Sequence, residues 1–343
     1  MDRLPIRNAT RPSPIVSMSE ASWRAELAAS FTRIEDLLEF LELPPRDLDA
    51  GRLAAGRFPF RVTRSYAARM RPGDPTDPLL RQVLPVADEL LGRPGFVADP
   101  VGDLQAVVAP GVLQKYHGRA LVIATGACAI NCRYCFRREF PYGESQLGRQ
   151  REDEALTHIA ADSTITEVIL SGGDPLVLSD ERLGFLVDKI AAIAHVERLR
   201  IHTRLPIVLP SRITPDLADM LAGSRLKALV VVHANHAREF DGEVNAALSE
   251  LRRAGVFLLN QSVLLRGVND AVHTLVALSK TLFAYGVLPY YLHVLDAASG
   301  TGHFDVPLMD ALALHDELKQ CLPGYLVPKL VREVAGEPYK TWL

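Results

Sequence analysis

Short apolar runs rich in β-branched residues alternate with segments of helical period from residue 121 onward, and this alternation restricts the possible fold more than any other feature. The runs span residues 121–125, 167–170, 199–203, 228–233, 256–263 and 290–295. The helical segments between them include residues 180–194, 214–221, 243–253 and 272–285, the first of which follows Ser179 as an N-cap. Continuous apolar strands that alternate with helices are typical of a parallel sheet covered by helices.

Six strand-helix units are two fewer than a closed eight-fold barrel needs, so we expect an incomplete (β/α)6 barrel, with a doubly wound sheet as the alternative. Residues 1–110 have a different sequence pattern, with a helical period at 34–41 that ends at two prolines. The sequence therefore predicts a helical cap or arm at 1–110, the barrel at 111–305, and a C-terminal helix with a final segment at 306–343.

Polar residues follow the ends of the predicted strands. Along the chain these are a cysteine cluster, Ser171 to Asp174, His202 to Arg204, His233, Gln261 within its strand, and Asp296. Because the carboxyl ends of parallel strands share one edge and carry function in both candidate folds, we expect these side chains to gather on one rim.

Composition excludes several classes of protein. The 343 residues include 38 Lys and Arg against 41 Asp and Glu, and 48% are hydrophobic, which is typical of soluble enzymes and excludes a disordered or fibrous chain. No apolar run approaches the ~18 to 20 residues of a membrane span, and the first twenty residues lack the apolar core of a signal peptide. We therefore expect a cytoplasmic protein without a membrane partner. Its near-neutral charge argues against a nucleic-acid partner.

Three of the four cysteines, Cys128, Cys132 and Cys135, fall within eight residues, whereas Cys321 lies far away. This CxxxCxxC spacing in a loop after a strand indicates a metal site rather than a disulfide framework. Three thiolates on one loop can hold a [4Fe–4S] cluster and leave one iron open. The alternative is a zinc site with a distant fourth ligand such as Cys321.

A CxxxCxxC loop after the first strand of a βα repeat resembles the radical S-adenosylmethionine (SAM) superfamily, in which SAM chelates the open iron. The resemblance gives a role to four residues at the end of the second strand, whose carbonyls and carboxylate would bind the ammonium of SAM, although Gly-Gly alone is only a turn signal. These are Ser171, Gly172, Gly173 and Asp174. It also implies that His233 and Gln261 lie beside SAM, while His233 could instead be a satisfied buried histidine.

Residues 58 to 340 resemble the lysine 2,3-aminomutase family within that superfamily. The motifs that carry the resemblance are DPTDP at 74–78, CAINCRYCFRR at 128–138, LSGGDP at 170–175, NQSVLLRGVND at 260–270 and PGYLVP at 323–328. Membership implies an isomerase that uses pyridoxal 5′-phosphate (PLP) besides the cluster and SAM. By alignment of the GEPYK stretch, Lys340 would form the imine with PLP. The resemblance also implies that Tyr116 and Arg119 lie near PLP. The alternative for Tyr116 and Arg119 is a surface role.

The resemblance also implies a lysine site, with Arg137 on the α-carboxylate and both Asp296 and Glu333 on the ε-ammonium. An arginine fork suits planar carboxylates, and two acidic groups favour a cationic side chain. Long aminomutases have Asp at the position of Glu333. The alternatives are charge compensation of the cluster for Arg137 and a surface carboxylate for Glu333. Because the chain ends three residues after Lys340, we expect the zinc-binding segment of the long aminomutases to be absent.

The expected function is conversion of L-lysine to β-lysine, as the (R) isomer, for modification of elongation factor P, because the resemblance is strongest to the short branch of the family. The implied partners are elongation factor P with its lysyl ligase, and an electron donor such as flavodoxin or ferredoxin. One alternative is a lysine 2,3-aminomutase of lysine catabolism or osmolyte synthesis. An alternative from another class is a non-catalytic Fe–S or zinc protein.

Overall fold

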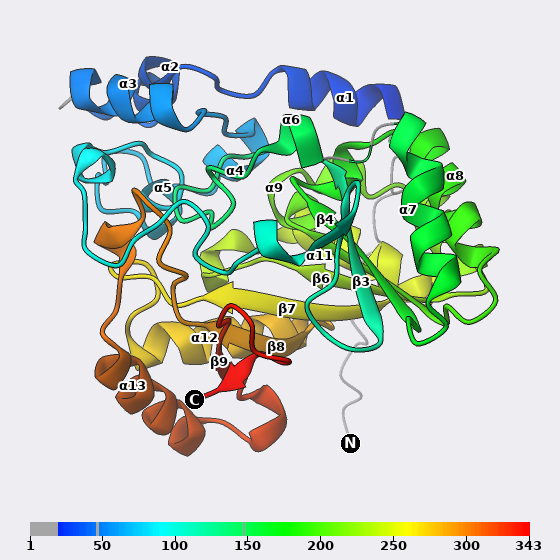
Figure 1. Cartoon of the computed structure of the whole chain (residues 1–343). Coiled ribbons are helices and arrows are strands. Elements are labelled where there is room, and N and C mark those ends of the chain that lie inside the picture. The colour runs from blue at the N-terminus through cyan, green and yellow to red at the C-terminus, as the bar shows by residue number, and fades with distance from the viewer. Residues whose placement is uncertain (1–19, 46–47, 146, 148) are drawn as a thin grey trace, which may run out of the picture.

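The computed structural model describes residues 20–45, 48–145, 147 and 149–343; the N-terminal segment for which we expect no signal peptide lies outside the described residues. The described part contains one sheet whose strands follow chain order from edge to edge (Figure 1). The strands are β1 (Val107–Ala109), β2 (Val112–Leu113), β3 (Arg119–Thr125), β4 (Glu167–Gly172), β5 (Arg198–Thr203), β6 (Lys227–Val232), β7 (Phe257–Val263), β8 (Leu288–His293), β9 (Lys329–Arg332) and β10 (Thr341–Trp342).

Strands β3 to β9 are parallel, whereas β1–β2, β2–β3 and β9–β10 pair antiparallel. A long helix follows each strand from β3 to β8. These helices are α7 (Arg149–Ala161), α8 (Asp180–Ala191), α10 (Pro215–Gly223), α11 (Gly242–Arg253), α12 (Val272–Ala284) and α13 (Leu308–Cys321). The strand order never reverses, which excludes the doubly wound alternative. The prediction of an incomplete (β/α)6 barrel is confirmed.

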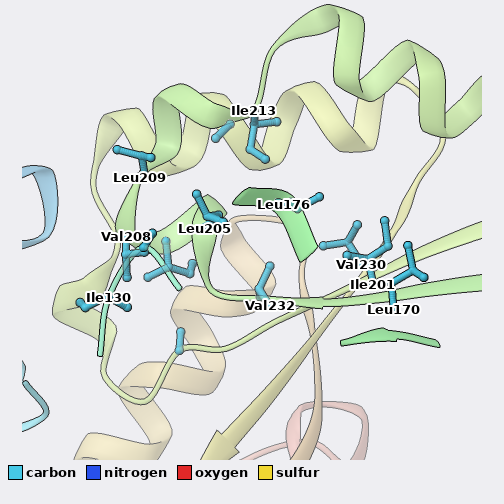
Figure 2. Packing of buried hydrophobic residues seen from close by; sticks show 14 of the residues in the cluster. Ile130, Leu170, Leu176, Ile201, Leu205, Val208, Leu209, Ile213, Val230 and Val232 are labelled. Atoms are coloured by element: carbon cyan, nitrogen blue, oxygen red, sulfur yellow. The ribbon is translucent and has the colours of Figure 1, made fainter. Parts of the chain in front are cut away.

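Local sequence explains these elements. Three consecutive valines of β6, Val230 to Val232, are fully buried, as expected for a parallel strand covered on both faces. The hydroxyl of Ser179 accepts a hydrogen bond from the backbone N–H of Arg182, so the predicted N-cap of α8 is confirmed. Figure 2 shows the result of this arrangement: Leu170, Ile201 and Val230 of neighbouring strands pack together in one apolar core.

The N-terminal region packs along one side of the barrel, where its helices are drawn in blue and cyan in Figure 1. They are α1 (Glu20–Ala28), α2 (Ile34–Phe40), α3 (Leu48–Arg57), α4 (Arg64–Ala67) and α5 (Pro78–Arg81). Trp23 of α1 is fully buried, and the Arg212 guanidinium lies 4.6 Å from the centre of its ring. Aromatic burial and a cation–π contact therefore hold this region on the barrel. No helix in the described ranges combines the length and apolarity needed to cross a membrane.

Candidate active site

A cavity of about 440 Å³ lies inside the partial barrel. Its walls include Arg119 and Leu121 of β3 and Arg200 and His202 of β5, because alternate residues of a strand face the same side. The cavity thus extends from the carboxyl ends of the strands toward their beginnings. All residues given a role from the sequence line it: Tyr116, Arg119, Cys128, Cys132, Cys135, Arg137, Ser171, Gly172, Gly173, Asp174, His233, Gln261, Asp296, Glu333 and Lys340.

The three clustered cysteines lie on the loop after β3. Burial and then the charge of Cys132 raise the pKa of Cys135 to about 11, and burial followed by the charge of Cys135 raises the pKa of Cys128. Such thiols become thiolates when iron supplies compensating positive charge, so the donor set suits a cluster. Cys321 is exposed at the end of α13 and does not line the cavity.

The arrangement disfavours the three-cysteine zinc site. Within the described ranges, no three His, Cys, Asp or Glu side chains are grouped so that they could hold a single metal ion. A zinc ion needs its ligands to converge on one point. Each thiolate of a [4Fe–4S] cluster binds a different iron, so a cluster does not require its three sulfurs to converge on one point.

The N-terminal region anchors the cysteine loop. Arg133, between two of the cysteines, is fully buried and donates from Nε to Glu89 Oε1 (2.8 Å) and from Nη1 to the carbonyls of Phe58 (2.9 Å) and Pro59 (3.0 Å). Glu89 also accepts from Arg138 Nη2 at 2.7 Å. Because Arg133 and Glu89 are both buried, their ion pair holds the loop in place before any metal binds.

Close packing explains the two glycines at the end of β4. A Cβ on Gly172, whose φ is +108°, would lie 2.6 Å from the Thr125 carbonyl oxygen, and one on Gly173 would lie 2.3 Å from that of Ala127. Only glycine allows this approach to the start of the cysteine loop. The Gly172 carbonyl already accepts from the Tyr142 hydroxyl at 2.8 Å.

Asp174 joins the ends of two strands. Its Oδ1 accepts from the Thr203 hydroxyl and its Oδ2 from the Arg204 backbone N–H, each at 2.7 Å, and burial raises its pKa. Both oxygens therefore already have protein partners. In this geometry the Asp174 carboxylate connects the carboxyl ends of β4 and β5 and is not free.

Three polar side chains of the cavity wall each have one buried atom without a hydrogen-bond partner, as expected where a polar ligand binds. Nε2 of His202, Nε2 of His233 and Oε1 of Gln261 are buried and accept or donate no hydrogen bond within the described structure. Burial and then the charge of Arg204 lower the pKa of His233 to about 4, so its ring is neutral at pH 7. The unpartnered Nε2 does not fit the alternative of a satisfied buried histidine for His233.

A chain of charges links the two ends of the cavity. Arg137 Nε lies 2.6 Å from Asp103 Oδ2, Lys115 Nζ lies 2.5 Å from Asp103 Oδ1 and 2.8 Å from Glu333 Oε1, and Lys340 pairs with Glu333 Oε2. Although burial opposes it, the charges of Lys340 and Lys115 hold the pKa of Glu333 at about 2. Its side chain is only 14% exposed, so Glu333 is not a surface carboxylate.

Asp296 follows β8 and differs from Glu333 in having no partner. Its carboxylate forms no hydrogen bond or ion pair with any described residue, although it lines the cavity. Burial and then repulsion by Glu333 raise its pKa to about 7. An unpaired carboxylate of this kind gains from a cationic ligand.

Two arginines and a tyrosine lie toward the beginnings of the strands. The Arg119 guanidinium lies 5.2 Å from the centre of the Tyr116 ring, and Arg200 donates from Nη2 to Glu167 Oε2 at 3.0 Å while its Nε has no partner. These cations suit an anionic group such as a phosphate. Sequence reasoning missed Arg200, although its position two residues before His202 places it on the same strand face.

The residues Asp103 and Lys115 were also missed, because neither falls in a motif or a strand. Their function in the charge chain depends on contacts with Arg137 and Glu333, which are distant in the sequence. No local pattern could have indicated them.

A cysteine loop that opens into a partial (β/α)6 barrel defines a radical SAM enzyme, and the Radical SAM superfamily profile matches residues 122–278. The chain is 50% identical over 324 residues to the L-lysine 2,3-aminomutase of Escherichia coli K12, covering 94% of each. It is 44% identical to the Haemophilus influenzae enzyme of that name, covering 96% of this chain and 98% of the relative, and 34% identical to the Clostridium subterminale enzyme, covering 93% and 77%. The chain belongs to the lysine 2,3-aminomutase family. Membership implies an isomerase with a [4Fe–4S] cluster and SAM.

Proposed function

We propose that this enzyme converts L-lysine to (R)-β-lysine, with PLP as its third cofactor, and that the product modifies elongation factor P. The observation that carries the proposal is the charge pattern of the cavity. Arg137 offers a guanidinium, and Asp296 offers an unpaired, half-buried carboxylate in the same cavity. L-Lysine presents a carboxylate and a distant ammonium, which match these two groups.

The proposed cofactor sites are formed by residues that line the cavity. The three cysteines would hold the cluster, and the unsatisfied atoms of His233 and Gln261 would bind SAM, on the rim formed by Ser171 to Asp174. When bound, the cluster and SAM supply a carbon-centred radical, and PLP holds the migrating amino group. The protein's own task is to orient lysine and to exclude water.

Lys340 is the proposed attachment point of PLP, with Tyr116 and Arg119 beside it. The side chain of Lys340 is 18% exposed and lines the cavity, so it is not the solvated surface lysine that its place near the chain end would suggest. Its partner Glu333 also binds Lys115. Covalent use of Lys340 would leave one oxygen of Glu333 free, and Glu333 would then join Asp296 in binding the substrate ammonium.

The product isomer and its use are supported by the resemblance to the short branch of the family. The chain covers 94% and 98% of the two relatives to which it is 50% and 44% identical, against 77% of the Clostridium relative. The proposed partners are elongation factor P, its lysyl ligase, and flavodoxin or ferredoxin as electron donor. The competing proposal within the class is an aminomutase of lysine catabolism or osmolyte synthesis.

Anaerobic incubation of the reconstituted enzyme with L-lysine, SAM and dithionite, followed by chiral chromatography, tests the proposal. We expect (R)-β-lysine, and none with the Cys132→Ala variant as control. The (S) isomer would overturn the stereochemical proposal. Absence of β-lysine together with absence of PLP absorbance would favour a non-catalytic Fe–S protein. Mass spectrometry of elongation factor P from a strain lacking this gene tests the use of the product, and unchanged modification would overturn it.

A further inference from the structure

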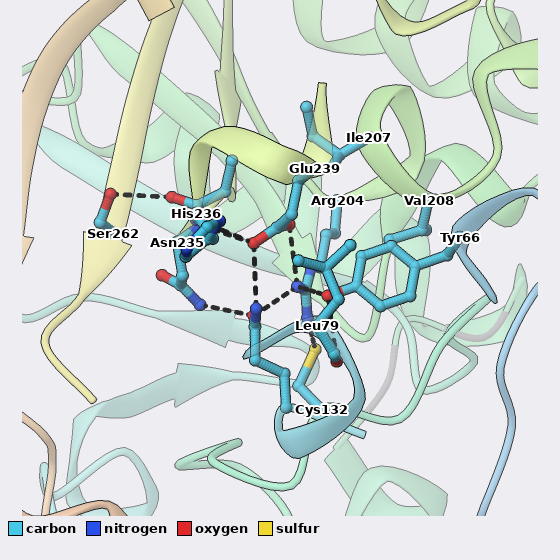
Figure 3. Close-up of polar contacts among 12 residues, drawn as sticks. Tyr66, Leu79, Cys132, Arg204, Ile207, Val208, Asn235, His236, Glu239 and Ser262 are labelled. Carbon is cyan, nitrogen blue, oxygen red and sulfur yellow. Dashed lines mark hydrogen bonds and ion pairs between the residues drawn. The ribbon is translucent and has the colours of Figure 1, made fainter. Parts of the chain in front are cut away.

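Arg204, directly after β5, connects the cysteine loop to a buried polar network (Figure 3). Its Nη1 donates to Cys132 Sγ at 2.7 Å. Its Nη2 donates to Gln82 Oε1 at 2.7 Å, to Glu239 Oε2 at 3.0 Å and to the Tyr66 hydroxyl oxygen at 3.1 Å. The residue is 5% exposed, so these contacts are shielded from water.

The network fixes the guanidinium independently of the cysteine. Glu239 is fully buried, and its Oε1 accepts from the backbone N–H groups of Asn235 (2.9 Å) and His236 (3.1 Å) and from Gln82 Nε2 (3.1 Å). The Arg204 guanidinium also lies 5.2 Å from the ring centre of Tyr66. A guanidinium held by this many contacts would keep its hydrogen bond to Cys132 with a cluster bound.

A purely structural role accounts for only part of this arrangement. The contacts of Nη2 are sufficient to tie the barrel to the N-terminal region, yet Nη1 is directed at a sulfur and the buried Nε has no partner. Within the described structure, Cys132 is the one loop cysteine whose sulfur accepts from a guanidinium. The guanidinium groups of Arg61, Arg137 and Arg138 act on the other two loop cysteines through charge alone. The asymmetry thus lies in the direct guanidinium–sulfur hydrogen bond, which among the described loop cysteines is made to Cys132.

We propose that Arg204 is a positioning residue that raises the reduction potential of the cluster through its charged hydrogen bond to Cys132, and that the carboxylate of Glu239 limits this rise. The inference rests on the proposed cluster site. Reduction adds an electron to the cluster, and a positive donor at a ligating sulfur stabilises that added charge. A carboxylate paired with the same arginine offsets part of the effect.

Two variants with opposite expected signs test the proposal. In Arg204→Gln the positive charge is lost, so the ratio of reduced to oxidised cluster at a fixed potential should fall about tenfold, which is ~59 mV for one electron. In Glu239→Gln the arginine stays and its counter-charge is lost, so the potential should rise. Arg212→Gln, which removes another fully buried guanidinium at a site away from the cysteines, is the control and should not change the potential.

The measurement is a potentiometric titration of the reconstituted protein, with electron paramagnetic resonance of the reduced cluster and iron analysis of each sample. Unchanged potentials, or shifts of the same sign in both variants, would overturn the proposal. If the Arg204→Gln protein does not bind iron, the change in the reduction potential of Glu239→Gln alone tests the proposal. Loss of the cluster from both variants but not from Arg212→Gln would overturn the proposal. It would show that Arg204 stabilises the cysteine loop and does not set the reduction potential of the cluster. Retention of the cluster by Cys132→Ala would instead refute the cluster site.

Discussion

Replacing Asp296 by Asn tests the charge assignment of the cavity through stability as well as activity. Burial and then Glu333 raise the pKa of the Asp296 carboxyl from 3.8 to about 7. The folded enzyme thus holds this proton more tightly than the unfolded chain does. The contribution of Asp296 to the free energy of unfolding therefore falls as the pH rises from about 4 to about 7. Above pH 7 the folded state bears the full cost of the ionised carboxylate.

The magnitude follows from the size of the shift. Three pH units correspond to about 4 kcal/mol as an upper limit, at about 1.4 kcal/mol per unit. The amide of Asp296→Asn occupies the same partnerless position, so we expect a gain of about 1–2 kcal/mol at pH 8. This gain should shrink by up to ~1.4 kcal/mol per unit as the pH falls below 7, so that it vanishes near pH 6 and the wild type is the more stable protein at pH 5.

Thermal unfolding of the lysine-free, reconstituted protein by circular dichroism between pH 5 and 8.5 measures this difference. Each kcal/mol should move the midpoint by about 2–4 °C. The matched control is Asp49→Asn, because the Asp49 side chain is 97% exposed and its removal should give no such slope. A variant that is less stable than the wild type at every pH, or a gain that does not change with pH, would refute the reasoning.

Added L-lysine should make the wild type more stable than Asp296→Asn, the reverse of the order expected without lysine at pH 8. If the substrate ammonium pairs with the Asp296 carboxylate as proposed, added L-lysine should stabilise the wild type, whereas binding to Asp296→Asn should be weaker by about 2–5 kcal/mol. Norleucine, which has the same length but no ammonium, should stabilise neither. Equal stabilisation of both proteins by lysine would place the ammonium elsewhere.

Three further predictions concern the cofactors and the cysteine loop. Alanine at any one of the three loop cysteines should remove the roughly four irons, whereas Cys321→Ala should keep them; iron analysis showing the reverse would contradict the cluster site. Lys340→Ala should abolish PLP absorbance and activity, and borohydride trapping with peptide mapping should find PLP on Lys340, so a label on another lysine would disprove the assignment. Gly173→Ala should displace the loop and lower iron content, because its Cβ would lie 2.3 Å from the Ala127 carbonyl oxygen, while Gly56→Ala, whose Cβ meets nothing within 4 Å, should retain iron.

The sequence determined the features that local patterns encode. Six apolar runs became β3 to β8, and the Ser179 cap begins α8 as predicted, because burial on both faces and capping depend on neighbouring residues. The short strands β1, β2, β9 and β10 were missed, since two to four residues are too few to show a period. The cysteine spacing indicated the cluster because all three ligands lie on one loop.

Only the tertiary structure decided how the charges of the cavity are paired. Glu333 is already bound by Lys115, which is 218 residues away in the chain, and by Lys340, whereas Asp296 is left without a partner. The sequence treated the two acidic residues as equivalent. Pairing depends on which side chains the barrel brings within about 3 Å of one another, and no periodicity or spacing along the chain encodes that distance.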